Sequence, residues 1–461
     1  MIPWWLLAMF VVGTNFALWA TVGLLRLLDG AVARHRASRR TSGGVHRLRK
    51  RAARGAAPAR PGSLSVDDVA VLIAAHNEGP VIADSLRAVL EVVPRANVHV
   101  VSDGSTDDTF DVACRCGVRV IRTSTNLGKA GALQEAIERF RLVDRFEAVM
   151  LLDADTRVDP GYFRAALPLF DDPRIVAVAG CVRSDWCRSG LSAVGKLLVC
   201  HRQRIYALTQ YLLKFGQTWR RVNATHIIPG FASLYRTEVL PHIEVNPPGL
   251  VIEDFNMTFE VYRKRLGKVG FTPSAVAVTQ DPGTLGDYVR QTKRWALGLW
   301  QTVRRHRLRA DLFSGMLVLL LLEQLTSSVL LVLLPLVLLL LVVPELLGAV
   351  LAVPEVAAIH GFVTTHVGFG TLLFGVVLPD LALTCAVALF LRRTRFLAFG
   401  ALFPLLRILD AVIALYALPL VWLSTSTGRW RSPSRRELGA ETISDTGSPA
   451  SSDTDSPASA A

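Results

Sequence analysis

Long apolar runs near both ends of the chain restrict its fold more than any other feature. Residues 1–28 are nearly free of charge, residues 312–343 form one long apolar run, and further runs cover 368–391 and 396–424. About 20 consecutive apolar residues are enough for a helix to cross the hydrocarbon core of a bilayer. The sequence therefore predicts a multi-pass protein of the cell membrane.

The first apolar run is followed by positive charge, whereas a cleaved signal peptide carries its positive charge ahead of the run. We therefore expect residues 1–30 to be an uncleaved transmembrane anchor. Residues 31–62 contain ten lysines or arginines and no acid, and they supply much of the net charge of +13. Such a run can bind nucleic acid, but beside a membrane span it more often marks the cytoplasmic side and contacts anionic lipid. We expect a basic cytoplasmic linker over 31–66, membrane lipids as partners and no nucleic acid.

The last third of the chain is predicted to form transmembrane or interfacial helices over residues 304–428. Basic clusters precede the run 312–343, close the second run and follow the third. If all three clusters lie on the cytoplasmic side, the three runs cannot each cross the membrane once, because the last cluster would then lie outside. Either 396–424 is an interfacial or re-entrant element, or 344–362 adds a crossing.

Two charged residues interrupt the last apolar run. Arg407 and Asp410 would be costly in lipid, so we expect them to face protein or water. Residues 429–461 are rich in Ser, Thr, Asp and Pro with little to bury, which predicts a disordered tail. The six cysteines form no C-x-x-C pair and no zinc spacing, which is typical of reduced cytosolic residues.

Between the membrane segments, residues 67–303 alternate strand-like and helix-like patterns. We predict strands over 69–75, 97–105, 118–123 and 147–153, and helices over 80–91, 106–115 and 129–141. Continuous Val, Ile and Leu runs fit parallel strands covered on both faces. The expected fold class is an α/β domain with a mostly parallel, Rossmann-like sheet, combined with a helical transmembrane region.

Polar residues follow these strands where each one ends. They are His76, Asn77, Glu78, Asp103, Asp153 and Asp155. In such sheets, ligands gather at the carboxyl edge of the strands. Asp153 and Asp155 point to the same face in an extended segment, and their like charges repel unless a cation lies between them. Hard oxygen ligands suit Mg²⁺ or Mn²⁺, although the pair can also belong to a solvated turn. The cluster fits a nucleotide whose diphosphate is bridged to protein by a metal.

A second group of residues lies at a helix start after the third strand. The Rossmann glycine fingerprint and the P-loop are both absent from the chain. Instead, Gly128, Lys129 and Gly131 begin a predicted helix, where backbone N–H groups and one ammonium can meet a phosphate. A plain helix cap fits the same residues equally well.

Two further motifs lie nearer the second membrane region. Glu253 and Asp254 stand at a likely helix start, where carboxylates also serve as caps. Gln291, Arg294 and Trp295 fall within about one helical turn and can share a surface patch. An amphipathic interfacial helix with a Trp anchor is the alternative interpretation, and it is compatible with a catalytic role.

Seven segments taken together carry a family resemblance. "IAAHNEG", "SDGSTDDT", "NLGKAGAL", "LLDADTRVDP", "PGFASLYRTEVL", "IEDFNMTFEV" and "QTKRWALG" occur in this order. In order and spacing they resemble family 2 glycosyltransferases over roughly residues 70–303. The last segment is similar to the Q-x-x-R-W pattern of the membrane-bound processive branch, which includes poly-N-acetylglucosamine, hyaluronan, chitin and cellulose synthases.

The resemblance implies a GT-A fold and an inverting transfer from an α-linked UDP-sugar, with Mn²⁺ or Mg²⁺ as cofactor. It implies nucleotide-sugar contacts from Ala75, Asn77, Glu78, Asp103, Lys129, Asp153, Gln291 and Arg294. It implies metal ligation by Asp155 and Asp153, and catalysis by Asp254, as the base, and Glu253. It implies acceptor contacts from Trp295, Phe231, Ala232 and Ser233. His76 stands where relatives carry another residue type, and we expect a packed histidine.

From this resemblance we expect an enzyme that extends a β-linked polysaccharide and extrudes it across the membrane, with its catalytic domain in the cytoplasm. The short set of spans favours an N-acetylglucosamine-type polymer, and the absence of a cyclic-dinucleotide-binding domain argues against bacterial cellulose synthase. Partners would be the UDP-sugar, a glycan or glycolipid acceptor, and export or assembly proteins. Two alternatives stay open: a non-processive transferase acting on a membrane lipid, and a catalytically dead scaffold of an export complex.

Overall fold

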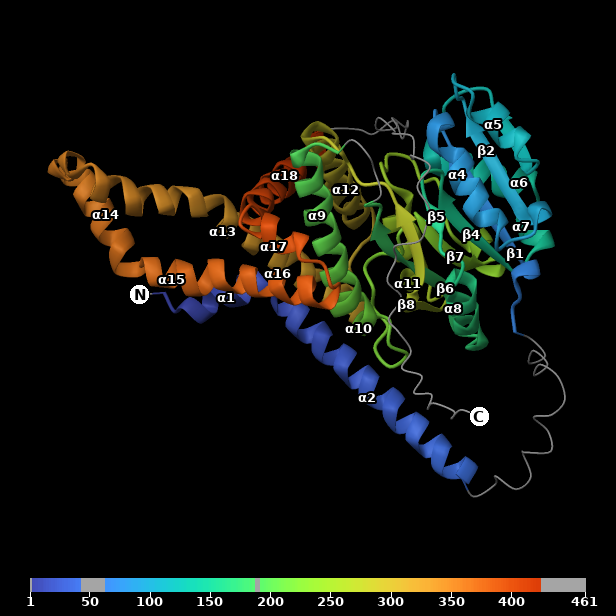
Figure 1. Ribbon diagram of the computed structural model, residues 1–461, viewed down its shortest axis with the longest axis horizontal. Coiled ribbons are helices and arrows are strands. Elements are labelled where there is room, and N and C mark those ends of the chain that lie inside the picture. The colour runs from blue at the N-terminus through green and yellow to red at the C-terminus, as the bar shows by residue number, and fades with distance from the viewer. Residues whose placement is uncertain (1, 43–62, 187–190, 424–461) are drawn as a thin grey trace, which may run out of the picture.

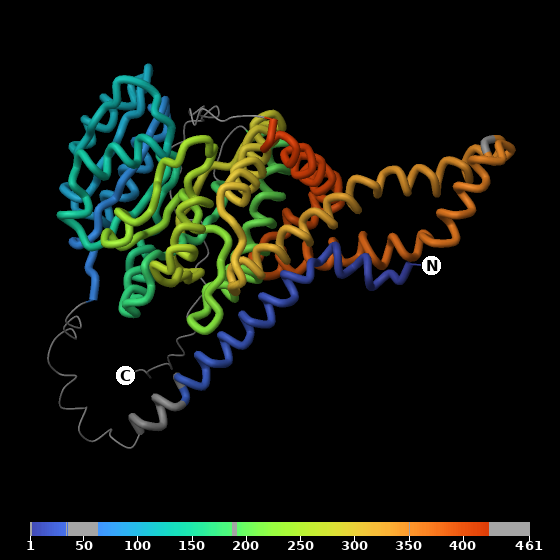
Figure 2. Tube along the Cα trace, turned by 180° about the vertical axis from the view of Figure 1, so that it is seen from behind, coloured from blue at the N-terminus to red at the C-terminus, as the bar shows by residue number. Residues whose placement is uncertain are grey.

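The computed structural model describes residues 2–42, 63–186 and 191–423. Part of the predicted basic linker and the whole predicted tail, 429–461, lie outside the described residues. An α/β domain stands at one end of the molecule, a group of packed helices lies beside it, and a long helical arm projects from the other end (Figure 1). Figure 2 shows the same three parts from behind.

The α/β domain is built on one mixed sheet. Its strand order is β3 (Arg119–Thr123), β2 (Val98–Asp103), β1 (Val69–Ala75), β4 (Ala148–Asp153), β7 (Ala232–Arg236), β6 (Ile175–Ser184), β8 (Lys268–Thr279) and β5 (Arg157–Val158). The first four strands in this order are mutually parallel. β7 runs antiparallel to both β4 and β6, and β6 is parallel to β8. The predicted α/β class is confirmed, and the parallel half of the sheet contains the four strands that the sequence indicated.

Helices cover both faces of this sheet. The helices between residues 79 and 305 are α4 (Gly79–Leu90), α5 (Thr109–Arg115), α6 (Gly128–Arg139), α7 (Leu142–Arg145), α8 (Tyr162–Ala166), α9 (Ala193–Ala207), α10 (Phe215–Gln217), α11 (Glu253–Arg263) and α12 (Leu285–Arg305). Those that contact strands include α4, α5, α6, α8 and α9, whereas α12 packs against α18, α11 and α9. On α4, Ile82, Leu86 and Val89 follow helical spacing and are fully buried in one core layer. On α6, Leu133 and Ala136 belong to the layer on the opposite face. Two apolar layers therefore hold the sheet and fix its carboxyl edge.

The amino-terminal apolar segment forms two helices, and within residues 2–42 one stretch, 14–33, is long and apolar enough to cross a membrane. α1 (Trp4–Val12) and α2 (Thr14–Ser42) meet at Gly13, whose φ of 97° suits glycine. A Cβ on Gly13 would lie 2.6 Å from Oε1 of Glu323. The Glu323 carboxylate accepts hydrogen bonds from the backbone N of Asn15 at 2.8 Å and from its Nδ2 at 3.1 Å. A carboxylate from a distant helix thus caps the start of α2, which then continues into the expected linker.

Polar side chains of α2, among them Arg26, bind this helix to the α/β domain. Arg26 donates to the carbonyl of Phe215 at 2.6 Å and to that of Phe271 at 3.1 Å. Gly216 permits the close approach, because a Cβ there would lie 2.2 Å from the carbonyl oxygen of Trp19. The first apolar segment is therefore positioned by the domain as well as by other helices.

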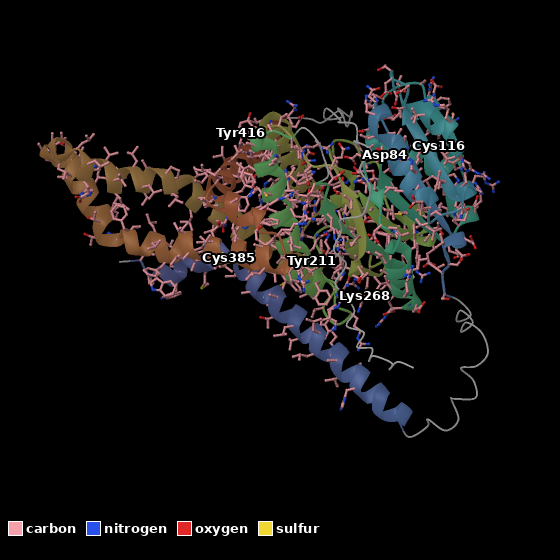
Figure 3. The ribbon with its side chains drawn as sticks, viewed as in Figure 1. Asp84, Cys116, Tyr211, Lys268, Cys385 and Tyr416 are labelled. Atoms are coloured by element: carbon pink, nitrogen blue, oxygen red, sulfur yellow. The ribbon has the colours of Figure 1, made fainter. Side chains whose placement is uncertain are left out.

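The last third of the chain is helical. Its helices are α13 (Leu312–Leu346), α14 (Pro354–His366), α15 (Phe369–Leu372), α16 (Leu378–Phe390), α17 (Arg395–Gly400) and α18 (Phe403–Leu423), and a π-helical turn over 373–377 joins α15 to α16. Among the described residues, four helical segments are long and apolar enough to cross a membrane: 14–33, 312–346, 369–390 and 403–423. Side chains along the projecting arm are mostly carbon (Figure 3).

The charged residues of the last apolar run face protein, as predicted. Arg407 lies 2.6 Å from Oδ1 of Asp380 on α16. Asp410 accepts a hydrogen bond of 2.7 Å from the hydroxyl of Tyr288 on α12. Paired in this way, both charges avoid the cost of an isolated ion in an apolar surrounding.

Candidate active site

The polar residues that follow β1, β2 and β4 meet at one edge of the sheet, because these strands are parallel. His76 is packed into this edge. Its Nδ1 lies 2.6 Å from the carbonyl oxygen of Asp103, and its Nε2 lies 3.1 Å from Nδ2 of Asn126. The expectation of a packed histidine is confirmed, and the ring joins the ends of β1 and β2 to the turn before α6.

Asp103 organises the start of α6. Its buried carboxylate accepts hydrogen bonds from Oγ1 of Thr123 at 2.8 Å and from the backbone N of Leu127 and of Gly128, each at 2.9 Å. Gly128 has a φ of 80°, which glycine adopts without strain. The carboxylate therefore satisfies N–H groups that the helix start leaves open. Its predicted contact with uridine stays a prediction.

Three other predicted nucleotide contacts lie at the end of β1. Ala75 and Glu78 are fully buried. Asn77 has a φ of 54°, and its Oδ1 accepts a hydrogen bond of 2.8 Å from the backbone N of Thr106. This hydrogen bond holds the loop after β2 against the turn after β1. Ala75 and Glu78 thus lie beneath the carboxyl edge of the sheet, and Asn77 joins the two loops at that edge.

Lys129 links the end of β4 to the start of α11. Its Nζ lies 2.7 Å from Oδ1 of Asp153 at the end of β4 and 2.8 Å from Oε1 of Glu253 at the start of α11. It also lies 3.3 Å from the carbonyl oxygen of Gly230. Burial opposes the charge of Lys129, but the two carboxylates outweigh it and raise the pKa of the ammonium. Lys129 is therefore a fixed positive charge between two acidic groups.

Asp153 and Asp155 form the acidic pair predicted to bind a metal. Burial raises the pKa of Asp153, the Lys129 ammonium opposes this effect, and the like charge of Asp155 adds to it. Asp155 is buried, and its Oδ1 lies 3.3 Å from Oγ1 of Thr156. Within residues 2–42, 63–186 and 191–423, no three His, Cys, Asp or Glu side chains are grouped to hold a metal. Two carboxylates fit a Mg²⁺- or Mn²⁺-type site that draws further ligands from substrate phosphates and water.

Glu253 and Asp254 begin α11, and their surroundings separate their proton affinities. Burial would raise the pKa of Glu253, but the charge of Lys129 and, to a smaller extent, that of Arg294 lower it. Burial and the Glu253 charge raise the pKa of Asp254 to about 7. The Asp254 carboxylate accepts hydrogen bonds from the backbone N of Phe255 at 2.7 Å and of Gly230 at 3.3 Å. Adjacent carboxyl groups with separated pKa values are typical of acid–base chemistry.

The segment predicted to line the acceptor entrance belongs largely to the interior of the sheet. Ala232 and Ser233 are fully buried in β7, an interior strand between β4 and β6 that is covered on both faces. Ser233 donates to the carbonyl of Pro229 at 2.6 Å. Their predicted contact with an acceptor stays a prediction. Phe231 is also largely buried, and its carbonyl accepts a hydrogen bond of 2.9 Å from the backbone N of Asp153.

Gln291, Arg294 and Trp295 all lie on α12, as the sequence indicated. Arg202 of α9, which the sequence motifs do not include, contacts the same stretch of α12. Its Nη2 lies 2.6 Å from Oγ1 of Thr292 and 3.3 Å from Oε1 of Gln291. The available signal was "HRQR" at 201–204, a group of cations inside a helix with apolar ends.

The chain is similar in sequence to known proteins. A family model described as "Glycosyltransferase like family 2" matches residues 67–298, half of the chain. The poly-beta-1,6-N-acetyl-D-glucosamine synthase of Staphylococcus epidermidis is 26% identical over 279 residues, which are 57% of this chain and 62% of that protein. The Staphylococcus aureus protein of the same name is 27% identical over 274 residues, with the same two shares. The chain thus spans less than two thirds of the length of these relatives.

A solved structure with a similar course of the chain is the mannosyltransferase PcManGT of Pyrobaculum calidifontis, in complex with GDP-Man and Mn²⁺. It is 17% identical, with a TM-score of 0.47, and the match covers 86% of this chain and 99% of that one.

Proposed function

Because this chain belongs to glycosyltransferase-like family 2, we propose that it transfers a sugar from a UDP-sugar to a growing β-linked polysaccharide. The resemblance to poly-N-acetylglucosamine synthases favours N-acetylglucosamine as that sugar. The observation that carries the proposal is the position of Lys129. It joins Asp153, on the donor side, to Glu253, beside the candidate base, within 2.8 Å of each.

The donor would be held at the carboxyl edge of the parallel strands. Asp155 and Asp153 would hold Mn²⁺ or Mg²⁺, which neutralises negative charge on the departing UDP. Lys129 and Arg294 bring the chain's own positive charge to the same place, where the leaving group gains charge in the transition state. The ends of β1 and β2 at this edge are buried.

The acceptor would approach from the side of α11 and α12. Asp254 would take the proton from the attacking hydroxyl as the new bond to C1 forms, and an inverted, β-linked product follows from attack opposite the leaving group. Trp295 would stack its indole on the apolar face of the terminal sugar. Glu253 holds Lys129 and raises the proton affinity of Asp254.

The pH dependence of the reaction provides a test of the base. Only ionised Asp254 can accept a proton, and burial together with Glu253 raises its pKa to about 7. With donor and metal saturating, we expect kcat to fall about tenfold per pH unit below that value and to level off above it. Initial rates measured at constant ionic strength give this profile. A kcat that stays level down to about pH 5 would remove Asp254 from the role.

We further propose that the protein is a multi-pass protein of the cell membrane with its α/β domain on the cytoplasmic side. The support is the four apolar helices and the basic residues beside them, such as Arg304 and Arg305 before α13. The division into 1–30, 31–66, 67–303, 304–428 and 429–461 is part of this proposal. A polar glycan would cross the hydrocarbon layer between protein helices, and other export or assembly proteins would receive it.

The decisive experiment is a donor screen with the purified full chain and Mn²⁺. UDP-GlcNAc, UDP-glucose, UDP-glucuronate and UDP-galactose are each supplied, and the product is sized. A polymer formed from UDP-GlcNAc supports the proposal. One sugar attached to a membrane lipid would identify a non-processive transferase instead. UDP binding without transfer from any donor would identify a scaffold.

A further inference from the structure

We propose that Arg202 is a positioning residue that holds Trp295 in the orientation needed to bind the acceptor. The inference rests on the proposed function, since it assigns Trp295 to the acceptor. Arg202 lies on α9, outside the motifs that carry the family resemblance, and its side chain is directed at α12.

Arg202 lies between two aromatic rings of one helix face. Its guanidinium carbon is 4.4 Å from the ring centre of Tyr288 and 4.4 Å from that of Trp295. Tyr288 and Trp295 are seven residues apart, two turns along the same face of α12. Between them, Thr292 and Gln291 accept hydrogen bonds from Nη2. One planar cation therefore contacts one face of α12 over two turns of its amino-terminal half.

The guanidinium of Arg202 is buried, which carries a desolvation cost. Arg202 is only 3% exposed, and no described residue hydrogen-bonds to its Nε. Apolar side chains would join two helices at a lower desolvation cost. A guanidinium adds direction, because its plane stacks on aromatic faces while its N–H groups fix neighbouring oxygens. The position of the indole is thus specified by more than packing.

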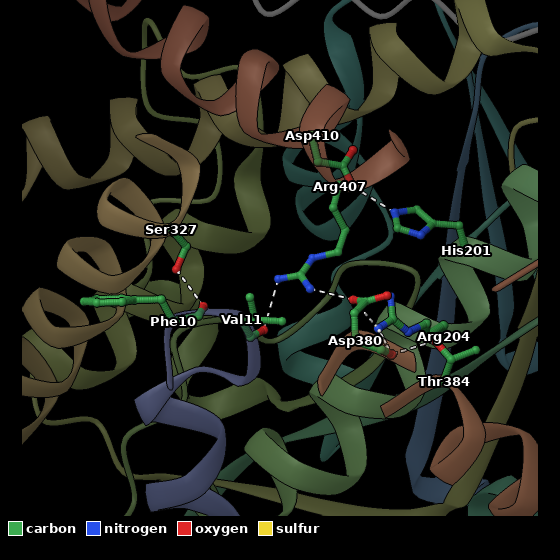
Figure 4. A network of polar contacts seen from close by, with 9 residues as sticks. All are labelled: Phe10, Val11, His201, Arg204, Ser327, Asp380, Thr384, Arg407 and Asp410. Carbon is green, nitrogen blue, oxygen red and sulfur yellow. Dashed lines mark hydrogen bonds and ion pairs between the residues drawn. The ribbon is translucent and has the colours of Figure 1, made fainter. Parts of the chain in front are cut away.

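The neighbours of Arg202 on α9 fasten the same helix to the membrane segments (Figure 4). Nε2 of His201 lies 3.0 Å from Oδ2 of Asp410 on α18, and the other oxygen of Asp410 accepts from Tyr288. Arg204 lies 2.7 Å from Oδ1 of Asp380 on α16, which also binds Arg407.

Three polar residues of α9, His201, Arg202 and Arg204, thus contact α18, α12 and α16 respectively. This arrangement gives the indole a fixed position relative to the helices that a growing glycan would pass. Arg202 would then act on acceptor binding and on product length, with little effect on donor binding.

The test compares Arg202→Met with Lys196→Met, which removes an exposed cation from the same helix. For Arg202→Met we expect the KM for an oligosaccharide acceptor to rise about tenfold and the product to shorten, with UDP affinity within about twofold of wild type. Arg202→Lys keeps the charge but loses the planar stack, so it should restore only part of the acceptor affinity. Lys196→Met should behave as wild type.

A double-mutant cycle with Trp295→Ala separates positioning from general stability. If Arg202 acts through the indole, the effects of Arg202→Met and Trp295→Ala on acceptor KM should be strongly non-additive. Additive effects, or an acceptor KM for Arg202→Met equal to that of Lys196→Met, overturn the inference while the proposed function stands. Should Arg202→Met fail to fold, Arg202→Lys carries the same cycle. If the wild-type chain adds a single sugar, the polymer proposal fails, but the acceptor KM still decides the role of Arg202.

Discussion

Replacing Asp254 by asparagine is expected to lower kcat about a thousandfold while UDP affinity stays near its wild-type value. The amide keeps the size of the carboxylate and its hydrogen bond from Phe255, but it cannot accept the acceptor's proton. Because Asp254 lies beside Glu253, and Lys129 pairs with Glu253, the donor side should remain ordered. Turnover is measured as UDP release with saturating donor and acceptor, and UDP affinity by calorimetry on the same preparation.

The control for this variant is Asp111→Asn, which changes an exposed carboxylate on α5 in the same way. It should leave both quantities unchanged. A kcat for Asp254→Asn within about threefold of wild type would exclude general-base catalysis by this residue, since such catalysis contributes at least about a hundredfold.

Replacing Asp155 by alanine should remove most of the effect that Mn²⁺ has on UDP binding. Removing even an outer partner of a metal ligand costs about ten- to a hundredfold in affinity, so loss of a direct carboxylate ligand should cost about a hundredfold or more. The measurement is a manganese titration of UDP affinity, which needs no turnover. UDP binding without metal should change little, because Lys129 and Arg294 remain in place.

Asp111→Ala provides the matched loss of an exposed carboxylate, and its titration should overlay that of the wild type. An Asp155→Ala titration that overlays the wild type as well would show that Asp155 is no ligand. The pair would then belong to a turn, which was the alternative interpretation of the sequence.

The parallel half of the sheet was predictable because its signals are local. β1 and β4 are apolar runs, β2 is rich in valine, and a polar residue ends or directly follows each of the three strands, so both the strands and the shared edge follow from the sequence. The burial of Ala232 and Ser233 was not predictable, because it depends on β7 entering the sheet antiparallel between β4 and β6. No sequence motif predicts that β7 is inserted between these two strands.

Other features depend on partners far apart in the chain. The break at Gly13 coincides with a carboxylate more than 300 residues away, at Glu323. The contacts of Arg202 with α12 join positions 89 and 90 residues apart. The bridge from Asp153 through Lys129 to Glu253 joins three elements. The sequence indicated that cations and carboxylates belong to the site. Which cation pairs with which carboxylate is seen only in the folded structure.

The length of α13 has a consequence for the lipid around it. Its 35 residues extend about 52 Å at 1.5 Å per residue, whereas the hydrocarbon layer is about 30 Å thick. A straight helix of this length must incline steeply or carry its ends beyond the layer. α13 packs against α18, and α18 packs against α12. The inclination of α13 therefore affects the position of α12, the helix that carries Trp295. Hydrophobic mismatch would then connect the acyl-chain length of the surrounding lipids to the geometry of the acceptor side.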